Sequence, residues 1–186
     1  DKAQGNWGLE YHEGTLSDNL ARHGLTAENI DMMIDTHLHS DHCGGNTIEV
    51  DGQVKPTFPN ATYYVQRREF EDATHPNVRP RATYLPENIE PILASDQFKL
   101  LDGDEEIVPG VRVVVTPGHT KGLQCVLIED EDSPVLFVSD LATYAVHLTR
   151  TAWVTAYDVY PLETIETKQV WQPWLVEHNA RVIFQH

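Results

Sequence analysis

The sequence is poor in cysteine and has no long apolar run, and each shortage excludes a class of protein. Its 186 residues contain two cysteines, Cys43 and Cys125, which are too few for a framework of disulfides. Such sparse use of cysteine is typical of a reducing interior, so we expect a cytoplasmic protein. No stretch approaches the roughly 18 consecutive apolar residues of a membrane span, so we expect no membrane association.

Positive charge is scarce as well. Thirteen Lys and Arg residues stand against 29 Asp and Glu residues, which gives a formal net charge of −16. A field of this sign repels phosphate backbones, and no basic stripe along the sequence offsets it. We therefore expect a solvated acidic surface and a small-molecule substrate, and we expect no nucleic acid as a partner. A homodimer is compatible with the sequence.

Helical and strand patterns alternate along the chain, which predicts a single layered α/β domain over residues 1–186. Strands are expected at 30–35, 62–66, in four runs between 98 and 140, and again at 181–185, with a helix at 67–74 and an irregular loop at 75–97. A helix at 163–179 is expected to turn Ile165, Val170, Trp174 and Leu175 inward and to kink at Pro173. The chain opens at Asp1 without methionine and stops at His186 after an apolar run, so both ends are expected to be cut from a longer domain.

Potential metal ligands gather where the first expected strand ends. The segment THLHSDHCGG places four of them within six residues: His37, His39, Asp41 and His42. Imidazole nitrogen and carboxylate oxygen are ordinary zinc ligands. Strand alternation puts His37 and His39 on one side, and a turn after His39 would direct Asp41 and His42 towards a second ion. Cys43 beside them is expected to be a small buried thiol rather than a soft ligand, and Cys125 to lie in the core.

Three more ligand types follow at the ends of later expected strands. His119 lies in TPGHTKG after VRVVV, Asp140 ends VLFVSD, and His186 ends RVIFQH. Taken singly, Asp140 could cap a helix and His186 could be a tail residue. Binding sites in α/β sheets gather at the carboxyl ends of strands, so their fixed order after the first cluster predicts one shared site.

The motifs HLHSDH, PGHTKG, VSD and FQH, within residues 30–186, resemble those of the metallo-β-lactamase superfamily. The resemblance implies an αββα four-layer sandwich that is truncated at both ends, because the family usually has a half-sheet before residue 1 and more chain after residue 186. It also implies that His37, His39 and His119 hold one metal, that Asp41, His42 and His186 hold a second, and that Asp140 bridges both.

Three further stretches resemble the lactonase-like branch, which includes quorum-quenching acyl-homoserine-lactone lactonases: FPNATYYVQRREFEDATHP, YLPENIEPI and AYDVYPLETIETK. This resemblance implies a dinuclear metal-dependent hydrolase that opens a small ester-like substrate, with a lactone as the best match. The expected cofactors are two divalent ions, zinc first, with Fe, Mn and Co as alternatives.

Two metals that share a water lower its pKa towards about 7, so that the hydroxide can attack a carbonyl carbon. Asp41 is expected to double as a proton shuttle to the leaving group. Lactonases of this branch often carry a tyrosine shortly after the bridging aspartate. Tyr144 lies four residues after Asp140 and is therefore a candidate oxyanion donor, with simple aromatic packing as the alternative.

Other activities stay open on the same ligand set. A β-lactam or a thioester could replace the lactone as substrate. A single-iron thiol or persulfide dioxygenase keeps the HxHxDH motif and belongs to a different class of enzyme. Counting the bound metals separates the two classes, because two zinc ions favour a hydrolase and one iron favours a dioxygenase.

Overall fold

The computed structural model describes residues 14–186. Its helices in that range are α2 (Leu16–Arg22), α3 (Ser40–Cys43), α4 (Arg67–Thr74), α5 (Glu90–Ala94), α6 (Ala145–Thr149) and α7 (Pro161–Glu177), with short 3-10 turns between them. Its strands are β1 (Met32–Ile34), β2 (Thr47–Val50), β3 (Gln53–Pro56), β4 (Thr62–Gln66), β5 (Phe98–Leu101), β6 (Glu105–Val108), β7 (Val111–Val115), β8 (Gln124–Ile128), β9 (Val135–Phe137) and β10 (Arg181–Ile183).

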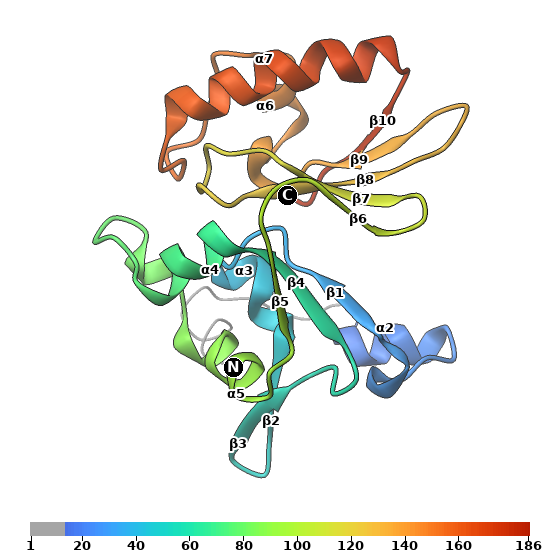
Figure 1. The fold of residues 1–186 in the computed structure, drawn as a ribbon, viewed down its shortest axis with the longest axis vertical. Helices are drawn as coiled ribbons and strands as arrows, with labels where there is room; N and C mark the ends of the chain where they lie inside the picture. Colours follow the sequence, from blue (N-terminus) through green and yellow to red (C-terminus); the bar gives the residue numbers. More distant parts are fainter. Residues whose placement is uncertain (1–13) are drawn as a thin grey trace.

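The strands form two main sheets and one hairpin. One sheet has the order β1-β4-β5 and is parallel throughout. The other has the order β10-β9-β8-β7-β6, in which β10 and β9 are parallel and the remaining pairs are antiparallel. Figure 1 shows α6 and α7 on one side of the five-stranded sheet, and the three-stranded sheet with α3, α4 and α5 on the other. The α/β class predicted from the sequence is confirmed.

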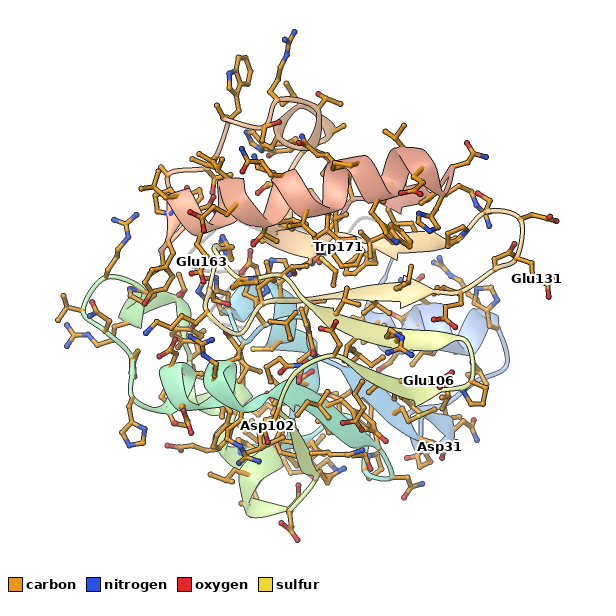
Figure 2. The ribbon with its side chains drawn as sticks, turned by 45° about the horizontal axis from the view of Figure 1, so that its top comes forward. Asp31, Asp102, Glu106, Glu131, Glu163 and Trp171 are labelled. Carbon is orange, nitrogen blue, oxygen red and sulfur yellow. The ribbon has the colours of Figure 1, made fainter. Side chains whose placement is uncertain are left out.

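The packing of α7 differs from the pattern that the sequence suggested. The helix continues through Pro173 without interruption, and Val170 is 68% exposed rather than turned inward. Trp171 lies on the side facing the sheet (Figure 2) and packs with Leu175 against the core of the five-stranded sheet. Polar side chains take inward positions because they reach backbone acceptors: the Lys168 ammonium donates to the carbonyl oxygens of His147 and Trp153. The helical periodicity of the sequence therefore predicted the inward face of α7 wrongly at Val170.

The acidic residues lie mainly on the outside, as their number predicted. Asp102, Glu106 and Glu131 are exposed, and Glu131 lies at the edge of the molecule in Figure 2. Among residues 14–186, no helix combines the length and the apolar character needed to cross a bilayer.

A buried glutamine connects the two main sheets. The Gln124 side chain on β8 donates to the Asp35 carbonyl oxygen at 2.8 Å and accepts from the Gln66 amide at 2.8 Å. Its backbone N–H donates to the Thr36 carbonyl oxygen at 2.9 Å. These bonds hold the end of β1 beside β8, and Asp35 and Thr36 directly precede the ligand segment.

We expect Gln124→Met to lower the free energy of unfolding by about 1–3 kcal/mol, because it leaves the Asp35 carbonyl and the Gln66 amide without these buried partners. Chemical denaturation followed by circular dichroism measures the change. The matched control is Gln169→Met on the exposed side of α7, which should change stability by no more than about 0.5 kcal/mol. Equal losses in the two variants would contradict the role of Gln124.

Candidate metal centre

The seven residues predicted as ligands all lie just beyond the carboxyl ends of strands. His37 and His39 follow β1, His119 follows β7, Asp140 follows β9, and His186 follows β10. The chain turns at His39, which precedes the first residue of α3, and this short helix carries the remaining two ligands, Asp41 and His42. The turn after His39 is therefore present, as the sequence predicted.

Three histidines form the most buried group. His37 is fully buried, and His39 and His119 are 5% and 2% exposed. The Nδ1 atom of His39 lies 3.0 Å from the Nε2 atom of His119, although 80 residues separate them in the sequence. One ring nitrogen from each of the three lies within 4.8 Å of the other two. This spacing could hold one metal ion.

A second group lies at the open side of the site. It consists of Asp41, His42 and His186, whose donor atoms also lie within 4.8 Å of one another. The Nε2 atoms of His42 and His186 are 3.4 Å apart, and His42 Nε2 lies 3.5 Å from Asp41 Oδ2. Asp41 and His186 retain partial exposure, whereas His42 is nearly buried. The group could hold a second ion that solvent and a substrate can reach.

Asp140 lies between the two groups. Its Oδ2 atom is 3.1 Å from His119 Nε2, 3.8 Å from His37 Nε2 and 3.2 Å from His42 Nε2. Its Oδ1 atom is 3.4 Å from His186 Nε2. One carboxylate thus faces members of both groups, which is the arrangement that a bridging ligand requires.

A strained residue places Asp140. The preceding Ser139 is buried and has a φ of 45°, in the left-handed region that a side chain disfavours. Its hydroxyl lies 2.9 Å from the hydroxyl of Thr36, the residue immediately before His37. This contact fixes the end of β9 against the end of β1. Strain of this kind costs about 1–3 kcal/mol and often marks a functional site.

Several buried polar atoms in the centre have no hydrogen-bond partner in the part of the chain that the structure describes. They are His37 Nε2, His39 Nε2, His42 Nδ1 and Asp140 Oδ1. His37 Nε2 and Asp140 Oδ1 face the other ligands, whereas His39 Nε2 and His42 Nδ1 are the far nitrogens of rings whose other nitrogen does so. An unsatisfied buried group of this type costs about 1–3 kcal/mol, so the two atoms that face the centre require compensation. Lone pairs of imidazole and carboxylate are the donors that a divalent cation accepts, and the residues therefore fit a metal site.

Burial and charge set the protonation states of the histidines in the metal-free protein. Burial, with the other histidines nearby, lowers the pKa of His39 to about 3 and the pKa of His37 well below its usual value. Burial also opposes protonation of His42, but its bonds with Asp140 and Asp41 outweigh that effect and raise its pKa to about 9. Near neutral pH the first two rings are therefore ready to bind a cation, whereas His42 must first lose a proton.

A buried carboxylate behind His119 was not predicted from the sequence. Asp158, 2% exposed, lies 3.0 Å from His119 Nδ1, and it also accepts from the Thr155 hydroxyl at 3.0 Å. A carboxylate on the far nitrogen of a ligating histidine fixes the ring and its tautomer. Asp158 lies in the stretch AYDVYPLETIETK, but no ligand pattern there marks it as a partner of His119, so only the fold reveals the contact.

The two cysteines and Tyr144 differ in how far the structure supports the predictions made for them. Cys43 is fully buried and donates to the Leu38 carbonyl oxygen at 3.3 Å, and Cys125 is fully buried too, which confirms both as buried thiols. Tyr144 is 54% exposed, and its ring contacts His147 with 5.7 Å between centroids. Within residues 14–186, no hydrogen bond or ring contact joins Tyr144 to the seven ligand side chains, so its catalytic role stays a prediction.

Comparison with known proteins agrees with this geometry. The family model described as the metallo-beta-lactamase superfamily matches residues 5–168. The chain belongs to this superfamily. The αββα sandwich that the resemblance implied is thereby confirmed as the fold class.

The curated relatives that this chain resembles include N-acyl homoserine lactonases. An N-acyl homoserine lactonase from Bacillus sp. is 41% identical over 129 residues, which cover 69% of this chain and 45% of the relative. An N-acyl homoserine lactonase from Agrobacterium fabrum is 24% identical over 200 residues, which cover 98% of this chain and 71% of the relative. The chain spans about half the length of the Bacillus relatives that it matches.

Solved structures give the same picture. A probable metal-dependent hydrolase from Staphylococcus aureus superposes with a TM-score of 0.89 at 30% identity, over 100% of this chain and 65% of that one. An N-acyl homoserine lactone hydrolase with its product N-hexanoyl-L-homoserine at the catalytic metal center superposes with a TM-score of 0.74 at 29% identity. That match covers 94% of this chain and 63% of the other.

Removal of Asp140 should damage the site more than removal of His186. Asp140→Ala takes away the negative charge that faces both groups, so at least one metal and nearly all activity should be lost. His186→Ala should weaken the second group and leave the three-histidine group loaded. Elemental analysis of each purified variant, together with Asp102→Asn at an exposed ion pair as control, measures the difference. Normal metal content in Asp140→Ala would disprove its bridging position.

The raised pKa of His42 predicts that metal binding releases a proton. Below about pH 9 the proton competes with the cation, so metal affinity should rise with pH and level off near that value. The stability of the metal-free protein depends on pH in the opposite direction. Protonated His42, paired with Asp140 and Asp41, stabilises the fold fully below about pH 6.5, and this contribution is lost as pH rises through about 9. Calorimetric zinc titrations at pH 7.5 in buffers of different ionisation enthalpy measure the proton. A result of zero released protons would contradict the assignment.

Proposed function

We propose that the protein is a dinuclear metal-dependent hydrolase that opens small neutral lactones. The observation that carries the proposal is the convergence of seven His and Asp side chains, in which the buried His37 Nε2 and Asp140 Oδ1 atoms face the other ligands and lack a hydrogen-bond partner. Hydrogen bonding within the described residues leaves His37 Nε2 and Asp140 Oδ1 unsatisfied, whereas binding of cations would satisfy both.

His37, His39 and His119 would hold one cation, Asp41, His42 and His186 would hold the other, and Asp140 would face both. Two divalent ions, with zinc as the expected element, would polarise an ester carbonyl and acidify water. Because His37, His39 and His119 are almost completely buried, they would keep bulk water from the inner side of the site. His186 and Asp41 lie at the more open side, where a substrate can approach.

Asp41 is the proposed proton carrier. Its carboxylate is 36% exposed, and its Oδ2 atom contacts His42 and His186. An Asp41 oxygen can therefore accept a proton from the attacking water and return it to the leaving alkoxide oxygen without a deep conformational change. General acid–base help of this kind contributes typically about 10²–10⁴-fold to a rate.

Two observations support a lactone as the substrate class. Curated relatives at 38–41% identity are named N-acyl homoserine lactonases, and a structural neighbour carries an acyl homoserine product at its metal center. The net charge of −16 disfavours anionic substrates and is compatible with a neutral ring ester.

The test combines metal counting with a substrate panel on the full-length protein. Two zinc ions per chain and faster hydrolysis of N-hexanoyl-homoserine lactone than of a β-lactam or a thioester are expected, with activity lost on chelation and restored by zinc. One iron per chain with oxidation of thiols would replace the hydrolase by a dioxygenase. Two zinc ions with preferred cleavage of the β-lactam or thioester would overturn the lactone assignment alone.

Tyr144→Phe tests the candidate oxyanion donor. If the hydroxyl stabilises the developing negative charge, kcat should fall by about tens to a few hundredfold while metal content stays unchanged. Tyr157→Phe is the matched control, because Tyr157 is an exposed tyrosine with no proposed part in catalysis, and its kcat should equal that of the parent. An unaltered kcat in Tyr144→Phe would return this residue to a packing role.

A further inference from the structure

Glu69 is a fully buried carboxylate that neither the ligand set nor the proposed mechanism uses. It lies on α4 and is 0% exposed. Its Oε1 atom accepts from the Leu38 backbone N–H at 3.0 Å and from the Tyr84 hydroxyl at 3.1 Å. Its Oε2 atom accepts from the Thr120 hydroxyl at 2.5 Å. Both carboxylate oxygens are thus engaged.

Two of these donors belong to the two segments that carry the three-histidine group. Leu38 lies between His37 and His39, and Thr120 directly follows His119. The first segment extends from the three-stranded sheet, whereas the second connects two strands of the five-stranded sheet. One carboxylate therefore joins ligand segments that originate from different sheets.

The third donor, Tyr84, also contacts the three-histidine group through its aromatic ring. The Tyr84 ring packs against the His39 ring with 4.9 Å between centroids and an interplanar angle of 56°. The same residue donates its hydroxyl to Glu69. Glu69 consequently restrains His39 twice, through the backbone at Leu38 and through the face of its ring.

A glycine permits this contact. A Cβ atom at Gly122, in the loop that carries His119, would lie 2.4 Å from both the Cβ and the backbone nitrogen of Glu69. Because α4 packs directly on that backbone, the helix presents the Glu69 carboxylate to the loop at a fixed position. The close approach of Glu69 therefore explains why the second glycine of PGHTKG, Gly122, has no side chain.

The burial of the Glu69 carboxylate also favours a link between this residue and the metal centre. Burial raises the pKa of its carboxyl group, although the bonds from Leu38, Thr120 and Tyr84 oppose that shift. Within residues 14–186, the hydrogen bonds to its oxygens come from neutral donors. A buried anion is costly when no cation compensates it, and cations held by the neighbouring histidines would supply the opposite charge.

We propose that Glu69 is a positioning residue for the metal centre: its carboxylate holds the His37–His39 segment and the His119 segment at the separation that the three-histidine group needs. This inference rests on the proposed function only in that the three histidines bind a metal. The substrate that the protein acts on does not enter it.

The primary experiment measures metal binding in Glu69→Gln, which retains the shape of the side chain and removes its charge. Zinc affinity of the full-length protein is determined by competition with a chelator, and the absorption spectrum of the cobalt-substituted protein reports the ligand geometry. We expect zinc affinity to fall by about 10–100-fold and the cobalt bands to shift. Parental affinity together with a parental cobalt spectrum would overturn the proposal.

Two matched pairs separate positioning from a general loss of packing. Tyr84→Phe removes a donor to Glu69, whereas Tyr63→Phe removes the hydroxyl of another buried tyrosine, which bonds to the backbone of Phe58 and Asn46. Zinc affinity should fall severalfold in the first variant and stay at the parental value in the second. Equal affinity in the two variants would contradict the proposal.

The second pair keeps the test decisive if Glu69→Gln does not fold. Thr120→Val removes the donor to Oε2, and Thr116→Val removes a buried hydroxyl of the same chain region that contacts Cys125 instead. A severalfold loss of affinity confined to Thr120→Val supports the proposal, and identical affinities overturn it. Because no substrate is present, a parent that binds zinc but hydrolyses no lactone would refute the proposed function and leave this result intact.

Discussion

The structure depends on one crowded contact, in which the Asp140 carboxylate lies within 3.8 Å of nitrogen atoms from four histidines. Four segments that are far apart in the sequence must end at the same place for this contact to exist. In the metal-free protein the arrangement is unfavourable in part, because buried nitrogen and oxygen atoms remain without partners. The surrounding fold therefore has to impose it, and bound cations would offset its cost.

The fold imposes the contact through polar side chains behind the ligands. Asp158 orients the ring of His119, the hydroxyl pair of Thr36 and Ser139 fixes the approach to Asp140, and Glu69 joins the segments around the three histidines. These groups are buried, and both the Thr36–Ser139 pair and Glu69 connect segments of the two main sheets. Rigid placement from helices and strands is what a site needs if its donors are to converge within a few tenths of an ångström. The metal centre is consequently a property of the whole domain rather than of one motif.

The convergence of the seven candidate ligands could be predicted from the sequence because strand periodicity and residue chemistry coincide there. His119, Asp140 and His186 each follow a short apolar strand, and the carboxyl ends of such strands meet at one edge. The supporting residues could not be predicted in this way. Glu69 lies in the charged segment RREFED, where Arg67, Arg68 and Glu71 are exposed, and its burial depends on contact with Gly122, 53 residues later. The inward face of α7 was mistaken at Val170 because Lys168 finds backbone acceptors that no sequence pattern announces.

The central claim is that the seven side chains bind two cations around Asp140. Anomalous diffraction at the zinc absorption edge, from crystals of the full-length protein grown with zinc, tests it most directly. The account predicts two anomalous peaks about 3.5–4 Å apart, one beside His37, His39 and His119 and the other beside Asp41, His42 and His186. A single peak, or peaks away from these residues, would contradict it.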